Sequence, residues 1–533
     1  MCDLDEGSNE DGMGTDNVER ISSKCMKCKE SPAVLIIRVG DAFCRNCFKE
    51  YFVHKFRAML GKNRLVFPGE KVLLAVSGGP SSSSLLFQVQ EGLSHKASKK
   101  LRFVPGIVHI EEGAACGKIQ EERTKIVADL KSIFSTSGFP FVIVYLEEVF
   151  SLPSSVLQSI FSLPTEKDDL YKEAVAGFMQ SYHTSVKKNL CHEKVAQETT
   201  LTEDHPHVSL LSTHAHANGT SISAFRGDFP YSPEQTKAVE KLFASVKTLT
   251  AKEEMLQTLR KHLILHTARI KGYSKVMMGD SCTRLAVKLL ANICLGRGAF
   301  LAMDTGFSDP RHGDITIIRP MREYSSKEIA FYNKLFGVPS VFTAGLNTKA
   351  PEKASIQHLT ESFIVKLQAD FPSTVSTIYR TSEKLNPRYS QTPADDKGTE
   401  TCLLCSCALG IELRDEASAF RAISISEELS QSKKPEGGQV SSSTTEECCA
   451  ENKVETLESS GCSCQSRERR NPTPDLWSLL CYSCKLVVKD MTSLDLLPEY
   501  ILEEANRRRR RTQMKREIQE YLFTSEDDAD TDP

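Results

Sequence analysis

Short apolar runs alternate with helical stretches along residues 65–150. The stretch 82–95 carries Leu85, Val89 and Leu93 four positions apart, which places these side chains on one face of a helix. Strands that alternate with helices predict a parallel sheet with helices on both faces, and therefore an α/β fold. The runs expected to form buried strands are Lys71–Val76 (KVLLAV), Phe103–Ile110 (FVPGIVHI) and Phe141–Leu146 (FVIVYL).

The same pattern resumes further along, so we expect one α/β domain built from residues 65–150 and 230–345. Its second part should open with a single long helix over 233–271. Ser325 and Glu328 form an S-x-x-E capping box, which predicts a helix start at this point. The other elements expected here are a strand at Lys275–Gly279, a helix over 281–296 and a strand at Ile315–Arg319.

Three further segments differ from this pattern. Residues 151–229 are less regular and predict an insertion, whose His-rich tract favours an exposed loop over a metal site. Residues 346–400 predict a helical connection. The acidic residues 1–21 and the Ser-, Glu- and Lys-rich residues 412–471 predict disorder. The histidines of the tract are His205, His207, His214 and His216.

Composition and chain ends favour a cytosolic protein without a membrane span. The sequence of 533 residues contains no apolar run of 18 residues, and its acidic N-terminus lacks the apolar core of a secretory signal. The chain has 18 cysteines, which in a reducing compartment more often bind metal or carry out chemistry than form disulfides. Four C-x-x-C pairs stand out among them.

The first two pairs lie in a module over residues 22–60. Tetrahedral zinc is held well by four thiolates from two C-x-x-C turns, and the intervening VLIIRVGDAFC predicts a β-hairpin that brings the pairs together. A redox dithiol is the alternative for either pair alone. The predicted zinc ligands are Cys25, Cys28, Cys44 and Cys47.

The other two pairs are separated by the segment expected to be disordered. They predict a zinc ribbon over 401–411 and 472–492 if that segment loops out, because loop-closure cost grows slowly with length. The predicted ligands are Cys402, Cys405, Cys481 and Cys484, with Cys407, Cys462 and Cys464 as rivals. On the predicted helix 281–296, Cys282 and Cys294 are expected to be buried small hydrophobes.

A glycine-rich turn follows the first predicted strand and precedes a helix. Glycines permit close backbone approach, and the amides of a helix N-terminus attract phosphate. The carboxyl end of a parallel strand is also where α/β folds bind ligands. The alternative is a turn kept for its geometry alone. The candidate nucleotide-binding residues are Ser77, Gly78, Gly79, Ser81 and Ser82.

Four segments in order resemble those of PP-loop ATPases, and in particular of the PP-loop tRNA thiolation proteins. KVLLAVSGGPSSSSLL is similar to their pyrophosphate loop, S-G-G-x-D-S, and GIVHIEEG to their second strand. MMGDSCTRLAVKLLANICLGRG is similar to the segment that reads G-H-x-x-D-D in the thiolases, and RPMREYSSKEIAFYNKLFG to the strand and helix that follow. The resemblance implies a PP-loop, adenine nucleotide alpha hydrolase-like α/β fold.

The departures from that family pattern fall on the residues that would carry out chemistry. Ser81 replaces the loop aspartate, and a serine supplies no fixed negative charge to magnesium. Asp280, Thr283 and Arg284 stand where the later motif has His and two Asp. The thiolases' cysteines are missing from the corresponding stretches, His262–Gly272 and Pro339–Gly345. The resemblance therefore implies a subunit whose own catalytic motifs have decayed.

The last segment, 493–533, predicts a basic helix over 498–523 followed by an acidic tail. Consecutive arginines surround a helix on all sides, which suits charge neutralisation rather than base-specific recognition. A solvated helix face or a localisation signal is the alternative. The candidate tRNA-binding residues are Arg507, Arg508, Arg509, Arg510, Arg511, Lys515 and Arg516.

The resemblance implies a cytosolic subunit of a tRNA 2-thiolation heterodimer. Its partner would be a catalytic PP-loop thiolase that binds ATP and transfers sulfur from a thiocarboxylated ubiquitin-related modifier to the wobble uridine of tRNAs for Lys, Glu and Gln. ATP on this chain itself is the less favoured reading. Two alternatives remain: an ATP-dependent tRNA sulfurtransferase in its own right, or a zinc-based interaction adaptor without an RNA role.

Overall fold

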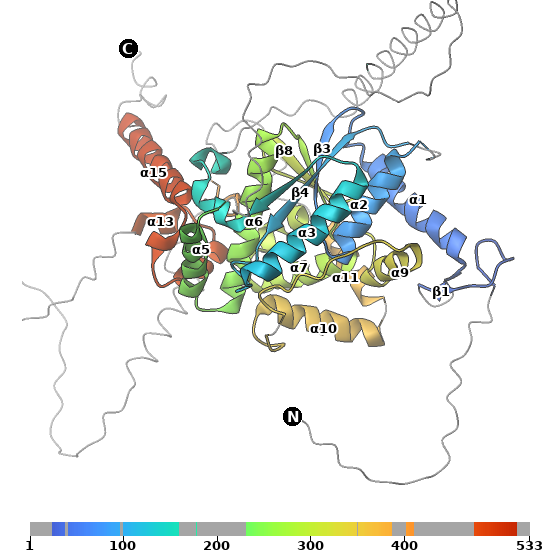
Figure 1. Cartoon of the computed structure of the whole chain (residues 1–533). Helices are drawn as coiled ribbons and strands as arrows, with labels where there is room; N and C mark the ends of the chain where they lie inside the picture. The colour runs from blue at the N-terminus through green and yellow to red at the C-terminus, as the bar shows by residue number, and fades with distance from the viewer. Residues whose placement is uncertain are drawn as a thin grey trace, which may run out of the picture. The chain divides into compact units, whose positions relative to one another are not determined.

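The computed structural model divides into two compact units, Met1–Asp396 with Leu486–Glu504, and Lys397–Lys485 with Ala505–Pro533. Its elements are labelled in Figure 1. The residues described are 24–37, 41–95, 97, 100–158, 177, 231–348, 350–371, 373–385, 401–409 and 474–519.

A six-stranded sheet in the order β5-β4-β3-β6-β8-β7 forms the centre of the first unit. All neighbouring strands are parallel except β7, which runs antiparallel to β8 at the edge. Val72, Leu73 and Leu74 of β3 are almost fully buried, as expected for a strand covered on both faces. The strands are β3 (Lys71–Ala75), β4 (Val104–Glu111), β5 (Phe141–Tyr145), β6 (Lys275–Met278), β7 (Ser308–His312) and β8 (Ile315–Ile318).

The direction of the crossover connections assigns the main helices to two layers. The connections through α2 (Pro80–Leu93) and α3 (Gln120–Ser137) step from β3 toward β5. The connection through α7 (Cys282–Cys294) steps the opposite way, from β6 to β8. Because such crossovers are right-handed, α2 and α3 cover one face of the sheet and α7 covers the other. The topological switch therefore lies between β3 and β6.

Helix α1 (Arg45–Asn63) joins the N-terminal cysteine module to the α2 side through aromatic packing. The ring of Phe52 stacks on Tyr332 of α9 (Ser326–Phe336), with centroids 3.9 Å apart. Tyr324 lies 4.4 Å from the same Phe52 ring, and its hydroxyl donates to the Phe52 carbonyl over 2.5 Å. These residues belong to one buried core that also includes β3 and α2.

The remaining elements are shorter or lie outside the central sheet. A two-stranded antiparallel hairpin, β1 and β2, lies between the first two cysteine pairs, as the sequence predicted. The elements are β1 (Leu35–Ile36), β2 (Ala42–Phe43), α5 (Pro233–Ser245), α6 (Leu249–Ile270), α8 (Leu301–Thr305), α10 (Ile356–Asp370), α11 (Thr374–Glu383), α13 (Pro474–Ser478), α14 (Tyr482–Lys489) and α15 (Glu499–Gln519). Short 3-10 turns cover Leu146–Ser151, Ser154–Leu157, Gly298–Phe300 and Leu494–Leu496.

The predicted α/β pattern is confirmed, with two differences. The single helix expected over 233–271 is wrong: Val246 is extended, and Thr248 caps a second helix by accepting a hydrogen bond from the Ala251 amide. Strand β7 was not expected, because its sequence SDPRH lacks strand-like apolar alternation. The capping box of Ser325 and Glu328 is present as predicted.

Several predictions lie outside the described residues. These are the disordered segments 1–21 and 412–471, the acidic tail, and nearly all of the insertion 151–229 with its histidines. Among the described residues, no helix combines the length and apolar character needed to cross a membrane.

Candidate functional site

The glycine-rich turn lies between β3 and α2, at the carboxyl edge of the sheet. Gly78 has φ +86°, and a side chain there would meet Leu130 Cδ2 at 2.6 Å, so only glycine fits. The Ser82 hydroxyl donates to the Gly79 carbonyl over 3.0 Å and lies 3.2 Å from the Ser77 hydroxyl. The predicted loop residues are thus brought together. Two of their hydroxyls, however, contact groups within the turn itself.

The turn also lies at the topological switch of the sheet. A Cβ added at Gly279, just after β6, would lie 3.0 Å from both the Ser81 carbonyl oxygen and Ser82 Cα. The end of β6 therefore approaches the first turn of α2 so closely that a side chain at Gly279 would require the neighbouring backbone to shift. Ligands of open α/β sheets bind at such a switch, and the first amides of α2 are suited to phosphate. Backbone geometry therefore fits a phosphate group here, although Ser81 brings no carboxylate for a metal.

Acidic side chains gather at the carboxyl ends of the strands, and four of them are paired with an arginine of the same chain. After β4, Arg260 donates to Glu112 over 2.7 Å. The buried Arg123 contacts Glu111 at 2.5 Å and Glu147 at 2.7 Å. These three carboxylates are therefore held by internal cations and are not free ligands for magnesium.

Asp280, which follows β6, is the fourth paired carboxylate. Its Oδ2 lies 3.3 Å from Nε of the buried Arg319. Burial alone would raise the pKa of Asp280, but Lys288, Arg319 and Arg284 together lower it below its ordinary value. In turn, burial lowers the pKa of Lys288 to about 8. The position that resembles a catalytic motif thus holds an ionised aspartate neutralised by protein cations.

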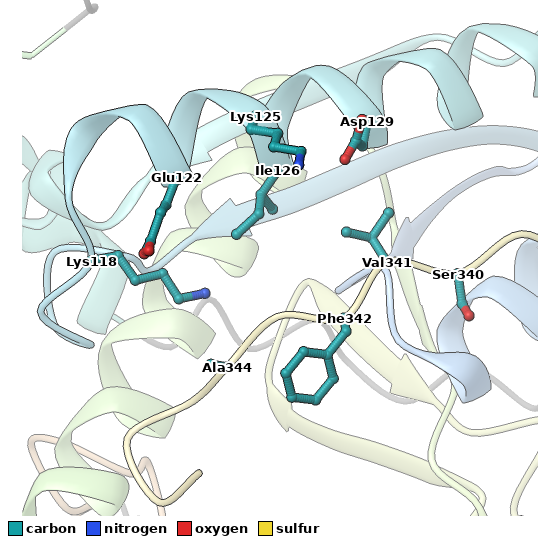
Figure 2. A pocket seen from close by; sticks show the side chains of 9 residues that line it. All are labelled: Lys118, Glu122, Lys125, Ile126, Asp129, Ser340, Val341, Phe342 and Ala344. Carbon is teal, nitrogen blue, oxygen red and sulfur yellow. The ribbon is translucent and has the colours of Figure 1, made fainter. Parts of the chain in front are cut away.

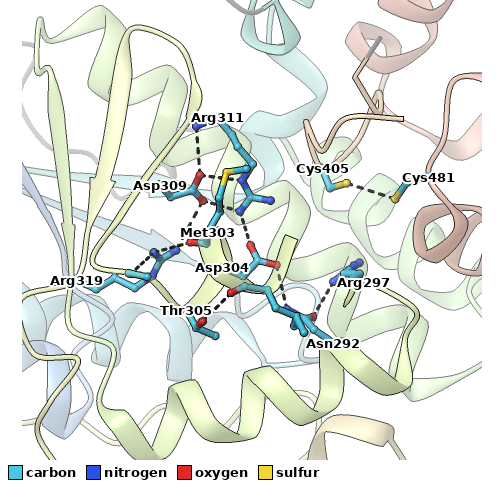
Figure 3. A network of polar contacts seen from close by, with 12 residues as sticks. Asn292, Arg297, Met303, Asp304, Thr305, Asp309, Arg311, Arg319, Cys405 and Cys481 are labelled. Atoms are coloured by element: carbon cyan, nitrogen blue, oxygen red, sulfur yellow. Dashed lines mark hydrogen bonds and ion pairs between the residues drawn. The ribbon is translucent and has the colours of Figure 1, made fainter. Parts of the chain in front are cut away.

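Arg319 is fixed by a polar network shown in Figure 3. Its guanidinium donates to the carbonyls of Met303 and Gly306 over 3.2 and 3.0 Å. It also lies 3.8 Å from Asp309, whose carboxylate receives two hydrogen bonds from the guanidinium of Arg311 and one from its backbone amide. Because its nitrogens are engaged on several sides, Arg319 cannot swing away from Asp280 without breaking buried contacts.

The two remaining residues of that motif have structural contacts. The Thr283 hydroxyl accepts a hydrogen bond from the Ser326 amide over 3.2 Å, which links α7 to the start of α9. The Arg284 amide caps α7 by donating to the Ser281 hydroxyl. Both contacts are hydrogen bonds within the fold and do not resemble the contacts that hold a metal or a nucleotide.

A thiol that sequence reasoning passed over also lies near this edge. Cys116 follows β4 and is half-buried. Burial, and then the charge of Glu112, raise its pKa to about 11. It therefore stays protonated at neutral pH and is a poor nucleophile.

A pocket of about 590 Å³ opens beside the glycine-rich turn. One wall is α3 with the loop before it, and the other is the segment after α9, which is anchored by a hydrogen bond of 2.9 Å from the Val341 amide to the Gly78 carbonyl. Figure 2 shows the lining side chains. They are Lys118, Glu122, Lys125, Ile126, Asp129, Ser340, Val341, Phe342 and Ala344.

The first predicted metal set is brought together as expected. The sulfurs of Cys25, Cys28, Cys44 and Cys47 lie within 4.8 Å of one another, and those of Cys28 and Cys44 are 4.0 Å apart. A tetrahedral zinc ion with bonds of about 2.3 Å separates its sulfurs by roughly 3.8 Å. The cluster could therefore hold a zinc ion with little rearrangement.

The second cluster, in the other unit, has the same geometry. The sulfurs of its four predicted ligands also lie within 4.8 Å of one another, and those of Cys405 and Cys481 are 3.5 Å apart. The Cys481 amide donates to Cys402 Sγ over 3.3 Å, the kind of bond that stabilises a thiolate. Cys407 is not in this cluster. The other two alternative ligands, Cys462 and Cys464, lie outside the described residues.

The cysteines of α7 differ from each other. Cys282 is buried against α10 and α11 as expected. Cys294 is exposed, so the prediction that it is a buried hydrophobe is wrong. It occupies the last position of the helix, where the neighbouring Ile293 is exposed as well.

The predicted basic helix is present as α15, and its basic part belongs to the second unit. Arg508 is half-buried and donates to the Thr401 carbonyl over 2.6 Å, next to the second cysteine cluster. The other predicted basic residues have exposed side chains. They are Arg507, Arg509, Arg510, Arg511, Lys515 and Arg516.

The strand order and the S-G-G turn at the carboxyl end of β3 define a doubly wound α/β protein whose turn resembles that of the PP-loop ATPases. A family model described as cytoplasmic tRNA 2-thiolation protein 2 matches residues 355–486. The chain is 54% identical to the Danio rerio protein of that name, over 99% of this chain and 100% of that one. It is 51% identical to the Homo sapiens protein, over 95% and 94% respectively. The chain therefore belongs to the cytoplasmic tRNA 2-thiolation protein 2 family.

A similar solved structure is a U34-tRNA thiolase from Methanococcus maripaludis with its [4Fe-4S] cluster. The similarity has a TM-score of 0.42 at 13% sequence identity, and it covers 68% of this chain and 87% of that one.

Proposed function

We propose that this chain is a non-catalytic subunit of the cytoplasmic complex that 2-thiolates the wobble uridine of tRNA. Family membership supports the pathway. The observation that carries the non-catalytic role is the pairing of the carboxylates at the carboxyl edge with Arg123, Arg260 and Arg319. With Ser81 in the loop as well, neither the position of the family's loop aspartate nor these four paired carboxylates offers magnesium a free carboxylate.

The chemistry would be carried out by a partner subunit. In this proposal a catalytic PP-loop thiolase pairs with the chain as a heterodimer and uses ATP to activate the uridine at C2. Sulfur comes from a thiocarboxylated ubiquitin-related modifier, and the substrates are tRNAs for Lys, Glu and Gln. Any nucleotide at Ser77–Ser82 of this chain would be bound through backbone amides and not consumed.

The second unit would supply a surface for tRNA phosphates. Zinc held by the second cysteine cluster would fix the fold around Thr401, and Arg508 ties α15 to that residue. The exposed basic side chains of α15 would then project from a part of the fold that is held in place. Phosphate contacts of this kind strengthen binding without reading sequence.

Depletion and rescue test the proposal in cells. We expect loss of the chain to lower 2-thiouridine in tRNA nucleosides, and Ser81→Ala to restore it as fully as the unaltered chain. The purified chain should show no ATP–pyrophosphate exchange without its partner. Undiminished 2-thiouridine after depletion refutes the pathway, whereas exchange by the isolated chain, lost in Ser81→Ala, refutes the non-catalytic role.

Salt dependence tests the basic helix. The test variant replaces six exposed basic residues of α15 by alanine and keeps Arg508. We expect this variant to bind tRNA more weakly. The slope of log K against log salt should fall by roughly 0.7–0.9 for each phosphate that is no longer neutralised. Lys62→Ala, an exposed lysine on α1, is the control and should leave the slope unchanged. An unchanged slope in the α15 variant contradicts this role. That variant replaces Arg507, Arg509, Arg510, Arg511, Lys515 and Arg516.

A further inference from the structure

The pocket beside the glycine-rich turn carries an aromatic side chain that nothing described so far uses. Phe342 is 80% exposed, although it lies next to the well-anchored Val341. The pocket volume of about 590 Å³ falls within the range of ligand sites, roughly 300–1,000 Å³. An exposed aromatic ring at such a pocket, next to a residue held by a backbone hydrogen bond, can stack against a flat group.

The charges of the pocket narrow the choice of that group. Figure 2 shows Lys118 and Lys125 on the α3 wall, across from the segment that carries Phe342. Among the described residues, neither lysine has an ion-pair partner within 4 Å. Both ammonium groups are therefore available to an anion at the rim.

Two carboxylates limit how much negative charge the pocket can accept. Glu122 and Asp129 lie on the same wall, so the four ionisable side chains sum to no net charge. A nucleoside triphosphate with about four negative charges would be repelled by them, whereas an RNA phosphodiester brings one charge per nucleotide. The carboxylates can also accept hydrogen bonds from the N–H groups of a base.

We propose that this pocket binds one unpaired nucleotide of tRNA, with the base stacked on Phe342 and a flanking phosphodiester at Lys118 and Lys125. This assignment rests on the proposed function, which makes tRNA the RNA that the chain meets. Single-stranded loops are where proteins commonly capture unstacked bases on aromatic side chains. The residues that line the pocket belong to the first unit, and the basic part of α15 belongs to the second.

The test measures tRNA binding by the full-length chain. Phe342→Ala should raise the Kd about fivefold or more, the effect of losing one base–aromatic stack, and Phe342→Tyr should restore binding. Phe363→Ala is the matched control, since Phe363 is 53% exposed on α10 outside the pocket. Replacing Lys118 and Lys125 together by alanine should lower the salt slope by about 0.7, the value for one phosphate, whereas Lys131→Ala on α3 should leave it unchanged.

Cross-linking identifies the occupant directly. A tRNA with 5-iodouridine at single positions of its anticodon loop should cross-link on irradiation to the peptide that contains Phe342. ATP, added as a competitor before irradiation, should not reduce this cross-link. Loss of ATP binding in Phe342→Ala with tRNA binding intact assigns the pocket to free nucleotide and overturns the RNA assignment.

The two proposals fail in different ways. Equal tRNA affinity for Phe342→Ala and the unaltered chain, with no cross-link to this peptide, overturns the pocket assignment and leaves the thiolation role standing. Undiminished 2-thiouridine after depletion overturns the thiolation role, and the cross-link to Phe342 is still measured independently of it.

Discussion

Replacing Glu328 by Gln tests how the N-terminal cysteine module is joined to the sheet domain. The Glu328 carboxylate is 2% exposed, and its Oε1 lies 2.9 Å from Nζ of Lys55 on α1. The same oxygen accepts a hydrogen bond from the Tyr51 hydroxyl over 2.9 Å, while Oε2 accepts one from the Ser325 amide. One side chain thus caps α9 and holds α1 against it.

The cost of Glu328→Gln follows from the charge that it leaves behind. Burial alone would lower the pKa of Lys55, but Glu328 and Tyr51 raise it, so the lysine is charged in the folded protein. Removing one partner of a buried ion pair costs about 3–5 kcal/mol. Because the Lys55 side chain is 13% exposed and Gln keeps neutral hydrogen bonds, we expect the lower end, about 3 kcal/mol.

Hydrogen exchange is the suitable assay, because a chain with two units need not unfold in one step. A loss of about 3 kcal/mol corresponds to roughly 100-fold faster exchange of the buried amides in α1 and α9. The control is Glu50→Gln, which removes a salt bridge from Lys27 in which the side chains are 67% and 50% exposed. Such a pair contributes little, so its removal should change exchange by less than about fivefold.

The pH dependence has a definite sign. Burial alone would raise the pKa of Glu328, but Lys55 and the hydrogen bonds lower it below its ordinary value of 4.5. The stability from this pair is therefore fully present above about pH 5 and is lost as the pH falls through the depressed folded-state pKa. This role of Glu328 is refuted if Glu328→Gln exchanges no faster than Glu50→Gln, or if its effect persists unchanged at a pH where Glu328 is protonated.

Two further predictions follow from the site. Gly279→Ala should destabilise the chain by about 1–3 kcal/mol, because the added Cβ meets the α2 backbone at 3.0 Å. The control is Gly298→Ala, which should not destabilise the chain because nothing lies within 4 Å of the added Cβ. Equal melting temperatures for the two variants would contradict this prediction. Cys28→Ser and Cys481→Ser should each remove one zinc ion per chain in elemental analysis. The control Cys282→Ser should remove none. An unchanged zinc content in either ligand variant would argue against a zinc site at the cluster that contains the replaced cysteine.

The sequence predicted the elements whose signal is local. Buried strands such as Lys71–Ala75 need a continuous apolar run, and the capping box at Ser325 needs only a partner three residues on. The first cysteine cluster was also predictable, since the hairpin between its pairs is short. The helix break at Val246–Thr248 was missed, because apolar periodicity continues through it and only the Thr248 cap marks it.

Pairings between distant segments could not be predicted. Glu112 and Arg260 are 148 positions apart, and nothing in either neighbourhood marks them as partners. The pocket combines α3 with the segment around Phe342 for the same reason. Strand β7 was missed because its sequence lacks the apolar pattern that normally identifies a strand. Its extended backbone depends on pairing with β8, which the sequence does not show.

These distant pairings change what the departures from the PP-loop pattern mean. A missing aspartate at Ser81 could by itself leave a weakened metal site, because neighbouring carboxylates often compensate for one absent ligand. Here Asp280 faces Arg319, which is held by the carbonyls of Met303 and Gly306. A cation bound near Asp280 would have to displace a guanidinium that other buried groups keep in place, at the cost of leaving that charge unpaired. At Asp280 and the three paired glutamates, the arginines of this edge therefore supply positive charge from the protein itself, which stabilises the fold of the edge.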